Sequence, residues 1–122
     1  YRVPVFANYI PFIFEKLILI EERFWGMSRR VKLKQPQELF SQEEISKIIQ
    51  VCQTMNIDYC ELDLLRDKYS QKLYIIDIND TPGGLQGQKN PDEGRSIYDK
   101  GKREEAILSL ARAFHQAFLN NK

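Results

Sequence analysis

The chain has 122 residues, of which 43% are hydrophobic and 29% are charged, and this composition predicts one globular domain with a modest core. The formal net charge is +1, so the chain has no overall field to recruit nucleic acid or an anionic membrane. No apolar run approaches the roughly 20 residues of a membrane span, and no signal-peptide pattern is present. We therefore expect a cytoplasmic protein with neither nucleic acid nor a membrane as its partner.

The first third of the chain is predicted to contribute strands and loops. Residues 1–20 are rich in Val, Ile, Phe and Tyr, and Pro4 and Pro11 interrupt them. The best strand within this segment is residues 12–20. Residues 21–37 carry several basic side chains, and we expect a loop followed by a short strand there.

The first clear helix is predicted to begin at Ser41. Ser41 and Glu44 fit the capping box, in which the serine accepts from the backbone of the fourth residue and that residue's carboxylate reaches back. The residues that follow at the i, i+3, i+4 and i+7 positions of one buried face are Ile45, Ile48, Ile49 and Cys52. We expect this helix to end near Asn56, because asparagine tolerates the left-handed conformation of a helix terminus.

Two strands are predicted next, over residues 57–66 and 72–80, joined by the polar segment 67–71 as a β-hairpin. Arg66, at the end of the first strand, is expected to pair with Asp67 or with a neighbouring strand.

A loop over residues 85–100 and a final helix over residues 102–119 complete the chain. The apolar stripe of that helix, which we expect to be buried, consists of Ile107, Leu110, Ala111, Phe114 and Phe118. We interpret Cys52 and Cys60 as small buried residues in a reducing compartment, with a disulfide as the alternative. The elements together predict an α+β (α/β) fold with a largely antiparallel sheet and two main helices.

The hairpin places unusual residues near the end of a sheet. Because side chains alternate along a strand, Glu61 and Asp63 share one face of the first strand, and Asp77 and Asn79 share one face of the second. A hairpin symmetric about Ser70 would pair Asp63 with Asp77 and Glu61 with Asn79. The same symmetry would pair Leu65 with Ile75.

Opposed carboxylates at Asp63 and Asp77 need a compensator, because like charges directly across an antiparallel pair are destabilising. The compensator can be a proton, a Lys or Arg side chain, or a metal ion. Carboxylates with an amide oxygen suit a hard divalent ion such as Mg²⁺. The alternative is that one of these residues faces solvent at the end of the sheet and binds nothing.

Other site motifs fit this segment less well. An EF-hand loop beginning at Asp77 would need Gly at position 82 and an acid at position 88, where the chain has Pro82 and Gln88. No P-loop follows the Pro-Gly-Gly turn. A metal nuclease remains a third hypothesis, although Asn79 replaces the Lys of its motif and the chain has no basic surplus for DNA.

The segments ELDLLRD (61–67), LYIIDIN (73–79) and TPG (81–83) together resemble the C-terminal half of ATP-grasp proteins, a superfamily that includes D-alanine–D-alanine ligases and related carboxylate–amine ligases. The resemblance covers about residues 57–119. It implies that Asp63, Asp77 and Asn79 match the ligands of Mg²⁺ (or Mn²⁺), and that Gly83 lies where backbone amides meet phosphate or the acyl substrate.

The resemblance also implies ATP as cofactor and a small-molecule carboxylate as substrate, activated as an acyl phosphate and captured by an amine or thiol. Lys16 is the candidate to reach a phosphate, with a surface lysine whose stem packs on apolar residues as the alternative. Residues 1–122 then form a single domain that is the C-terminal part of a longer protein, whose N-terminal lobe would supply the remaining nucleotide contacts. The alternative function is a non-catalytic interaction or dimerisation module.

Overall fold

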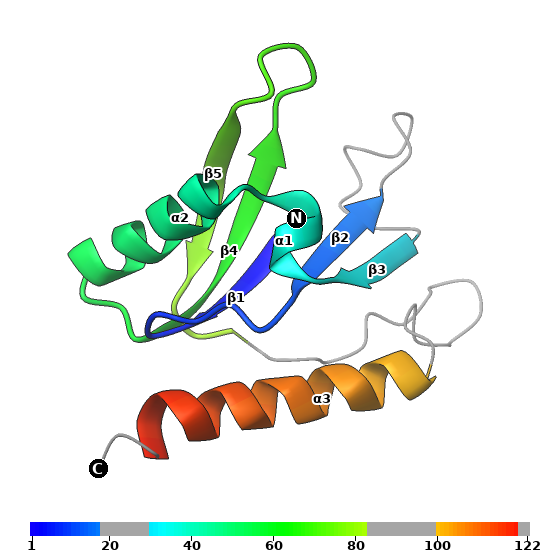
Figure 1. The fold of residues 1–122 in the computed structure, drawn as a ribbon, viewed down its shortest axis with the longest axis vertical. Helices are drawn as coiled ribbons and strands as arrows, with labels where there is room; N and C mark the ends of the chain where they lie inside the picture. Colours follow the sequence, from blue (N-terminus) through cyan, green and yellow to red (C-terminus); the bar gives the residue numbers. More distant parts are fainter. Residues whose placement is uncertain (18–29, 83–99, 120–122) are drawn as a thin grey trace.

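The structure, a computed structural model, describes residues 1–17, 30–82 and 100–119 (Figure 1). Five strands form one antiparallel sheet in the order β3-β2-β1-β4-β5. The strands are β1 (Arg2–Phe6), β2 (Ile13–Leu17), β3 (Arg30–Lys34), β4 (Tyr59–Arg66) and β5 (Leu73–Asn79). The predicted α+β class with a largely antiparallel sheet is confirmed, as is the short strand expected before residue 37.

Two long helices pack against the sheet. They are α2 (Gln42–Thr54) and α3 (Lys100–Phe114), which continues as a π-helical turn η2 (His115–Leu119), and a short helix α1 (Pro36–Leu39) precedes α2. The core beside α2 contains Ile13, whereas Ala106 of α3 packs with Phe12 and Phe14. Neighbouring residues of a strand point to opposite faces, so α2 and α3 cover opposite faces of the sheet. None of the described helices is long and apolar enough to cross a membrane.

Helix α2 begins as the sequence predicts. The Glu44 amide donates to Ser41 Oγ at 3.2 Å, and the Ser41 amide donates to Glu44 Oε2 at 2.9 Å, which completes the capping box. The helix ends at Thr54, and Asn56 adopts a φ of 54° in the left-handed region. The core cluster between α2 and the sheet contains Val3, Val5, Ile10, Ile13, Phe40, Ile45, Ile48, Cys52, Cys60, Leu62 and Leu64.

The buried face of α3 differs from the predicted stripe. Ala106 and Ala113 are fully buried, and Leu110 packs against the cluster that Ala106 forms with Phe12 and Phe14. Ile107 and Phe114 are instead 46% and 49% exposed. The predicted burial of Ile107, Ala111 and Phe114 is therefore wrong, because all three are exposed. Large side chains already stand on the sheet beneath this helix, so small alanines let its backbone approach closely and fill the remaining space.

Strand β1 lies in the strand-like segment 1–20 but outside its best predicted strand, and it contains Pro4, which argues against a central strand. Tyr1 and Leu64 exchange backbone hydrogen bonds, and such pairs recur at every second residue of an antiparallel ladder. Pro4 therefore directs its nitrogen toward β2 and not toward β4. The ladder on that side is registered only at Arg2 with Phe14, so the missing N–H of Pro4 interrupts no hydrogen bond there.

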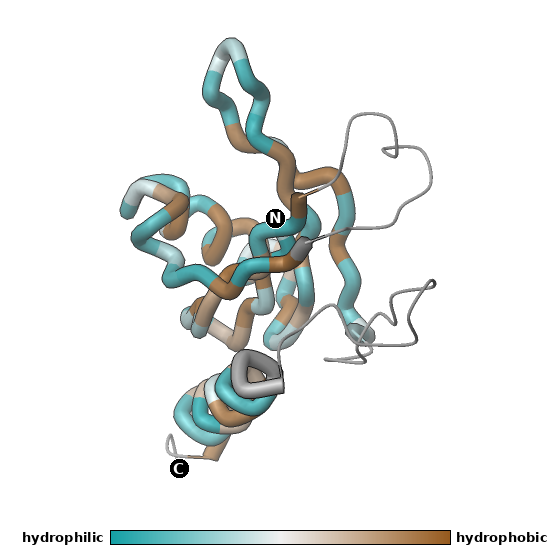
Figure 2. The backbone as a smooth tube through the Cα atoms, turned by 90° about the vertical axis from the view of Figure 1, so that its right-hand side faces the viewer, coloured by the Kyte–Doolittle hydropathy of each residue, from teal (hydrophilic) through white to brown (hydrophobic). Residues whose placement is uncertain are grey.

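The β4–β5 hairpin projects beyond the rest of the sheet, and its connecting loop is mostly hydrophilic (Figures 1 and 2). The Asp67 carboxylate accepts from the amides of Tyr69 and Ser70 at 3.2 and 2.6 Å, and Gln71 has a φ of 58°. Local hydrogen bonds and one left-handed residue thus form the turn that brings the two strands together.

Candidate functional site

The register of the hairpin places the predicted acidic residues opposite one another. Asp63 pairs with Asp77, and Glu61 pairs with Asn79. Paired residues of an antiparallel ladder share a face, so all four lie on the face of the sheet opposite α2. The predicted pairing of these residues is confirmed.

The register nearer the turn differs from the prediction. Leu65 pairs with Tyr74, and Ile75 pairs with Leu64, with a shift of register between Asp63 and Leu64. The predicted pairing of Leu65 with Ile75 is therefore wrong. The turn lies about half a residue earlier than assumed, and a β-bulge at Ile76 restores the symmetric register at the acidic residues.

Arg2 compensates the charge of Asp63. Its Nε lies 3.0 Å from Asp63 Oδ1 and its Nη2 lies 3.1 Å from Asp63 Oδ2, which is a two-point ion pair. The same Nε is 3.7 Å from Glu61 Oε2, and Lys16 Nζ is 4.0 Å from Asp63 Oδ1. Of the three compensators that the sequence left open, an arginine therefore stands at Asp63, with a lysine nearby.

Neighbouring strands bring these cations to the acidic residues. Arg2 pairs directly with Asp63 in the β1–β4 ladder, and Lys16 lies on β2, the next strand across the sheet. Sequence reasoning missed Arg2 because 61 residues separate it from Asp63. The available signal was weak, because Arg2 is the only polar residue in the apolar segment Arg2–Phe6.

The environment shifts the pKa values of the charged residues in opposite directions. Burial leaves Glu61 7% exposed and raises the pKa of its carboxyl, against the attraction of Arg2. Burial also acts on Asp63, but the hydrogen bonds and charge of Arg2, with the charge of Lys16, hold the pKa of Asp63 below its usual range. Burial and the charge of Arg2 lower the pKa of Lys16, which remains beside Asp63. Glu61 is therefore the carboxyl of this group that most readily takes a proton.

Asp77 and Asn79 are exposed on the edge strand β5. The Asn79 amide oxygen accepts from the backbone N–H of Thr81 at 3.1 Å, a local turn that fixes the orientation of that side chain. A carboxylate or amide oxygen has a second lone pair. Asp63 already accepts from Arg2, and Asn79 already accepts from Thr81. A further ligand would therefore use the remaining lone pairs of these oxygens.

The remaining predicted site residues have different positions. Lys16 is half-buried at the cluster, and Gly83 lies outside the described residues. Among residues 1–17, 30–82 and 100–119, no group of three or more His, Cys, Asp or Glu side chains is close enough to hold a metal ion. The candidate metal ligands Asp63, Asp77 and Asn79 include only two carboxylates. A third oxygen ligand would have to be the side-chain amide oxygen of Asn79.

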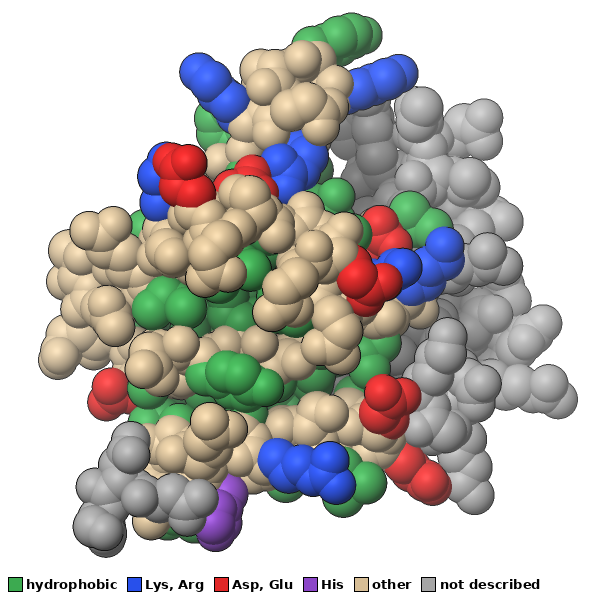
Figure 3. Space-filling view, viewed as in Figure 1, with side chains coloured by type: hydrophobic (Ala, Val, Ile, Leu, Met, Phe, Trp, Pro, Cys, Tyr) green, Lys and Arg blue, Asp and Glu red, His purple; other side chains and the backbone are tan. Residues whose placement is uncertain are grey.

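Arg66 has a structural position. It forms an ion pair with Glu44 of α2 and not with Asp67, which corrects the first of the two partners expected. Acidic and basic side chains lie side by side near the base of the hairpin in the space-filling view (Figure 3). Arg66 therefore connects the hairpin to α2 and is not part of the acidic site.

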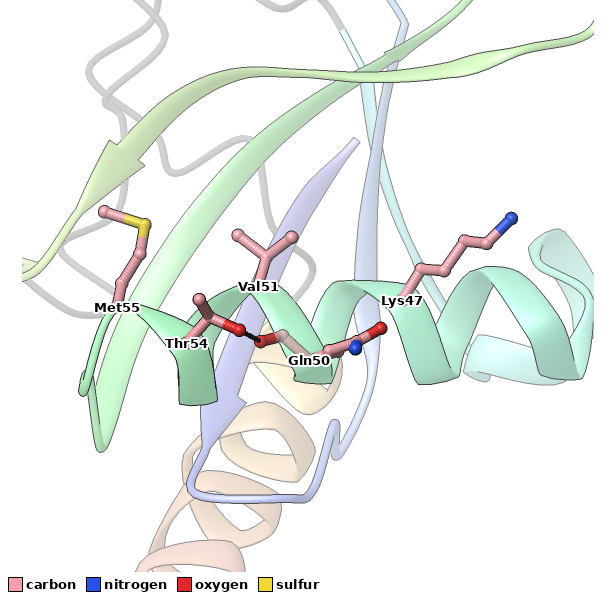
Figure 4. A pocket seen from close by; sticks show the side chains of 5 residues that line it. All are labelled: Lys47, Gln50, Val51, Thr54 and Met55. Carbon is pink, nitrogen blue, oxygen red and sulfur yellow. Dashed lines mark hydrogen bonds between the residues drawn. The ribbon is translucent and has the colours of Figure 1, made fainter.

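A shallow hollow of about 380 Å³ lies along α2 (Figure 4). It is lined by Lys47, Gln50, Val51, Thr54 and Met55, and the Thr54 hydroxyl donates to the Gln50 carbonyl at 2.8 Å. Its lining has a single charged side chain and no acid–base pair. The charged cluster of Arg2, Lys16, Glu61, Asp63, Asp77 and Asn79 on the opposite face is therefore the better candidate site.

Comparisons of the chain with models of protein families, with curated proteins and with solved structures found no match in any of the three.

Proposed function

We propose that the charged cluster binds a divalent cation together with a nucleotide, as the C-terminal lobe of an ATP-grasp protein would. The observation that supports this proposal is the register that sets Asp63 opposite Asp77 and Glu61 opposite Asn79. Oxygen-bearing side chains of two adjacent strands then lie on one face of the sheet, and two cationic side chains lie at Asp63.

Each residue of the cluster has a role under this proposal. Asp63, Asp77 and Asn79 provide oxygens for Mg²⁺ or Mn²⁺, which supplies positive charge to the phosphates of ATP. Arg2 and Lys16 bind phosphate oxygens, and Arg2 leaves Asp63 to do so. The protein's contribution is orientation and charge neutralisation.

The reaction under this proposal would be attack of a substrate carboxylate on the γ-phosphorus of ATP, which displaces ADP and forms an acyl phosphate; an amine or thiol would then attack the acyl carbon and release inorganic phosphate. The second lobe of the nucleotide site comes from a preceding segment or from a second chain. We expect residues 1–122 alone to bind nucleotide weakly and to turn over little.

The experiment is a backbone NMR titration of the protein with Mg²⁺, with ATP, and with both together. We expect selective shifts on β4 and β5 around Asp63, Asp77 and Asn79, largest when both ligands are present. Asp77→Asn should abolish the Mg²⁺-dependent shifts. Asp58→Asn is the matched control, because it removes one exposed carboxylate just before β4 and should leave the titration unchanged.

Arg2→Gln separates the two roles of Arg2. Loss of the guanidinium removes its two hydrogen bonds to Asp63 and leaves Lys16 as the nearby cation, so the variant should bind Mg²⁺ alone more tightly than the wild-type protein. It should bind Mg²⁺–ATP more weakly, because a phosphate ligand is lost. The proposed exchange would be contradicted if Arg2→Gln left both the affinity for Mg²⁺ and the affinity for Mg²⁺–ATP unchanged.

The second candidate is a non-catalytic interaction or dimerisation module. The ion pair between Arg2 and Asp63 favours it, because a carboxylate with a two-point partner needs no metal ion. Under this alternative, the spectrum does not respond to millimolar Mg²⁺ with ATP, and Asp77→Asn behaves like Asp58→Asn. Sedimentation of the protein over a range of concentrations then tests for a dimer.

A further inference from the structure

Two cysteines meet in the core on the α2 face of the sheet. Cys52 lies in the last turn of α2 and Cys60 lies near the start of β4. Their sulfur atoms are 3.6 Å apart, both side chains are fully buried, and both thiols are free. A separation of 3.6 Å is van der Waals contact, whereas the S–S bond of a disulfide is about 2.05 Å long, so the sulfurs must approach each other by about 1.5 Å to bond.

The backbone on both sides of the pair is held by hydrogen bonds. The Ile57 amide donates to the Cys52 carbonyl at 2.9 Å, and the Ala7 amide donates to the Asp58 carbonyl at 2.7 Å. Asn56 takes the left-handed conformation that reverses the chain between helix and strand. The fold therefore brings the two thiols together without needing a bond between them.

We propose that Cys52 and Cys60 form an oxidisable dithiol, which closes to an intramolecular disulfide when the oxidant is a low-molecular-weight disulfide such as oxidised glutathione. The thiolate of Cys52 attacks one glutathione sulfur, which breaks the glutathione disulfide and releases one glutathione thiolate. The thiolate of Cys60 then attacks the Cys52 sulfur and releases the second glutathione thiolate. The protein loses two electrons and two protons, and oxidised glutathione becomes two glutathione thiols.

Either thiol can donate in the hydrogen bond between the two sulfurs. With Cys60 as the donor, the bond lowers the pKa of Cys52, and the same bond, with burial and the nearness of Cys52, raises the pKa of Cys60. Cys52 is thus the more nucleophilic thiol. Because both are fully buried, an oxidant as large as glutathione reaches them only through local opening or during folding.

The bond would link the end of α2 to β4, the strand that carries Glu61 and Asp63. Oxidation therefore stabilises the connection between α2 and the sheet by restricting the unfolded chain. The charged cluster lies on the opposite face of β4, so the dithiol acts on stability and does not depend on the function proposed for that cluster.

The test measures the equilibrium in glutathione buffers of graded ratio. The denatured chain is refolded into each buffer, starting from its reduced and from its oxidised form, so that burial does not block the reaction. The reaction is quenched with acid, and free thiols are alkylated in denaturant. Intact mass then gives the fraction with the disulfide, because that form carries no alkyl group and weighs two hydrogens less than the unalkylated dithiol. The same measurement in concentrated urea gives the fraction for the unfolded chain.

We expect the ratio of disulfide to dithiol, at one buffer composition, to be at least about tenfold higher in the native protein than in urea, because the fold holds the sulfurs together. A native ratio equal to or below that in urea would overturn the proposal, as would mixed glutathione adducts in place of the internal bond. Cys52→Ala and Cys60→Ala are the controls, and each should give only a mixed disulfide. The comparison of native and unfolded wild-type protein stands even where a variant fails to fold.

Discussion

Arg66 is expected to stabilise the junction between the hairpin and the two helices that precede β4. Its Nη1 and Nη2 lie 2.7 and 3.1 Å from Glu44 Oε1 and Oε2. The same nitrogens donate to the carbonyls of Gln71 at 2.8 Å and Leu39 at 3.0 Å. The guanidinium carbon also lies 5.7 Å from the centre of the Phe40 ring. One side chain thus joins four segments of the chain.

The burial of the pair determines the size of the effect. The Arg66 and Glu44 side chains are 19% and 26% exposed, so the pair is neither open to solvent nor dry. Exposed pairs contribute about 0.2–1 kcal/mol, and removing one partner of a buried pair costs about 3–5 kcal/mol. We expect Arg66→Met to lower the free energy of unfolding by about 2–3 kcal/mol, which corresponds to a melting temperature roughly 10 °C lower for a domain of this size.

Urea unfolding of four proteins isolates the ion pair from the other contacts of Arg66. They are the wild type, Arg66→Met, Glu44→Gln and the double variant. Glutamine still accepts from the Ser41 amide, so Glu44→Gln retains the capping box and removes only the charge. We expect a coupling free energy of about 1 kcal/mol or more between the two positions.

Glu43→Gln is the matched control. Glu43 also lies in the first turn of α2 and pairs with Lys47 at 2.6 Å, but both of these side chains are exposed. Its substitution should cost no more than about 0.5 kcal/mol. If Arg66→Met costs as little as this control, or if the cycle shows no coupling, then Arg66 does not stabilise the junction as described.

Three further predictions concern pH and packing. The hydrogen bond from Arg66 lowers the pKa of Glu44 in the folded protein. The ionised Glu44 carboxylate therefore stabilises the fold above the ordinary glutamate pKa of about 4.3, and this stabilisation is lost as pH falls through the lowered pKa. Urea midpoints between pH 6 and 3 should therefore fall less steeply in Glu44→Gln than in the wild type. Burial raises the pKa of Glu61, so its contribution to stability is lost as pH rises through the raised value; the stability of Glu61→Gln relative to the wild type should increase from pH 4 to pH 7. Ala106→Leu should cost about 1–3 kcal/mol of unfolding free energy through overpacking, whereas Ile107→Ser should cost less than about 1 kcal/mol, because Ala106 is buried and Ile107 is half exposed.

Local signals in the sequence predict α2 well. The capping box at Ser41 and Glu44 depends on residues three apart, and the buried positions follow the helical period. The burial of α3 depends instead on what lies beneath the helix. Large apolar residues suggest a stripe through Ile107 and Phe114, but Phe12 and Phe14 on the sheet require small residues at the contact. That requirement lies in a strand about 90 residues away in the chain, and no local pattern contains it.

The acidic pairing was predicted correctly because two departures from ideal geometry cancel. Asp67 N donates to Lys72 O, which centres the turn half a residue before Ser70. The bulge at Ile76 then adds one residue to β5, and Asp63 meets Asp77 as the symmetric hairpin requires. Tyr74, Ile75 and Ile76 do not alternate with polar residues, so the sequence has no period there from which to locate a bulge.

The ion pair between Arg2 and Asp63 fits a phosphate site as well as it fits a structural role. A guanidinium binds a carboxylate and a phosphate by the same two-point hydrogen bonding, so under the proposed function Arg2 would exchange one such partner for another. That exchange would remove the two hydrogen bonds from Arg2 to Asp63, which pairs with Asp77 across the hairpin, and would leave Lys16 as the nearby cation. The cluster has two basic and three acidic side chains, so its formal charge is −1, and a divalent cation would change it to +1. Under the proposed function, the carboxylates would favour the cation and the cation would favour phosphate, so by linkage each ligand would raise the affinity of the protein for the other.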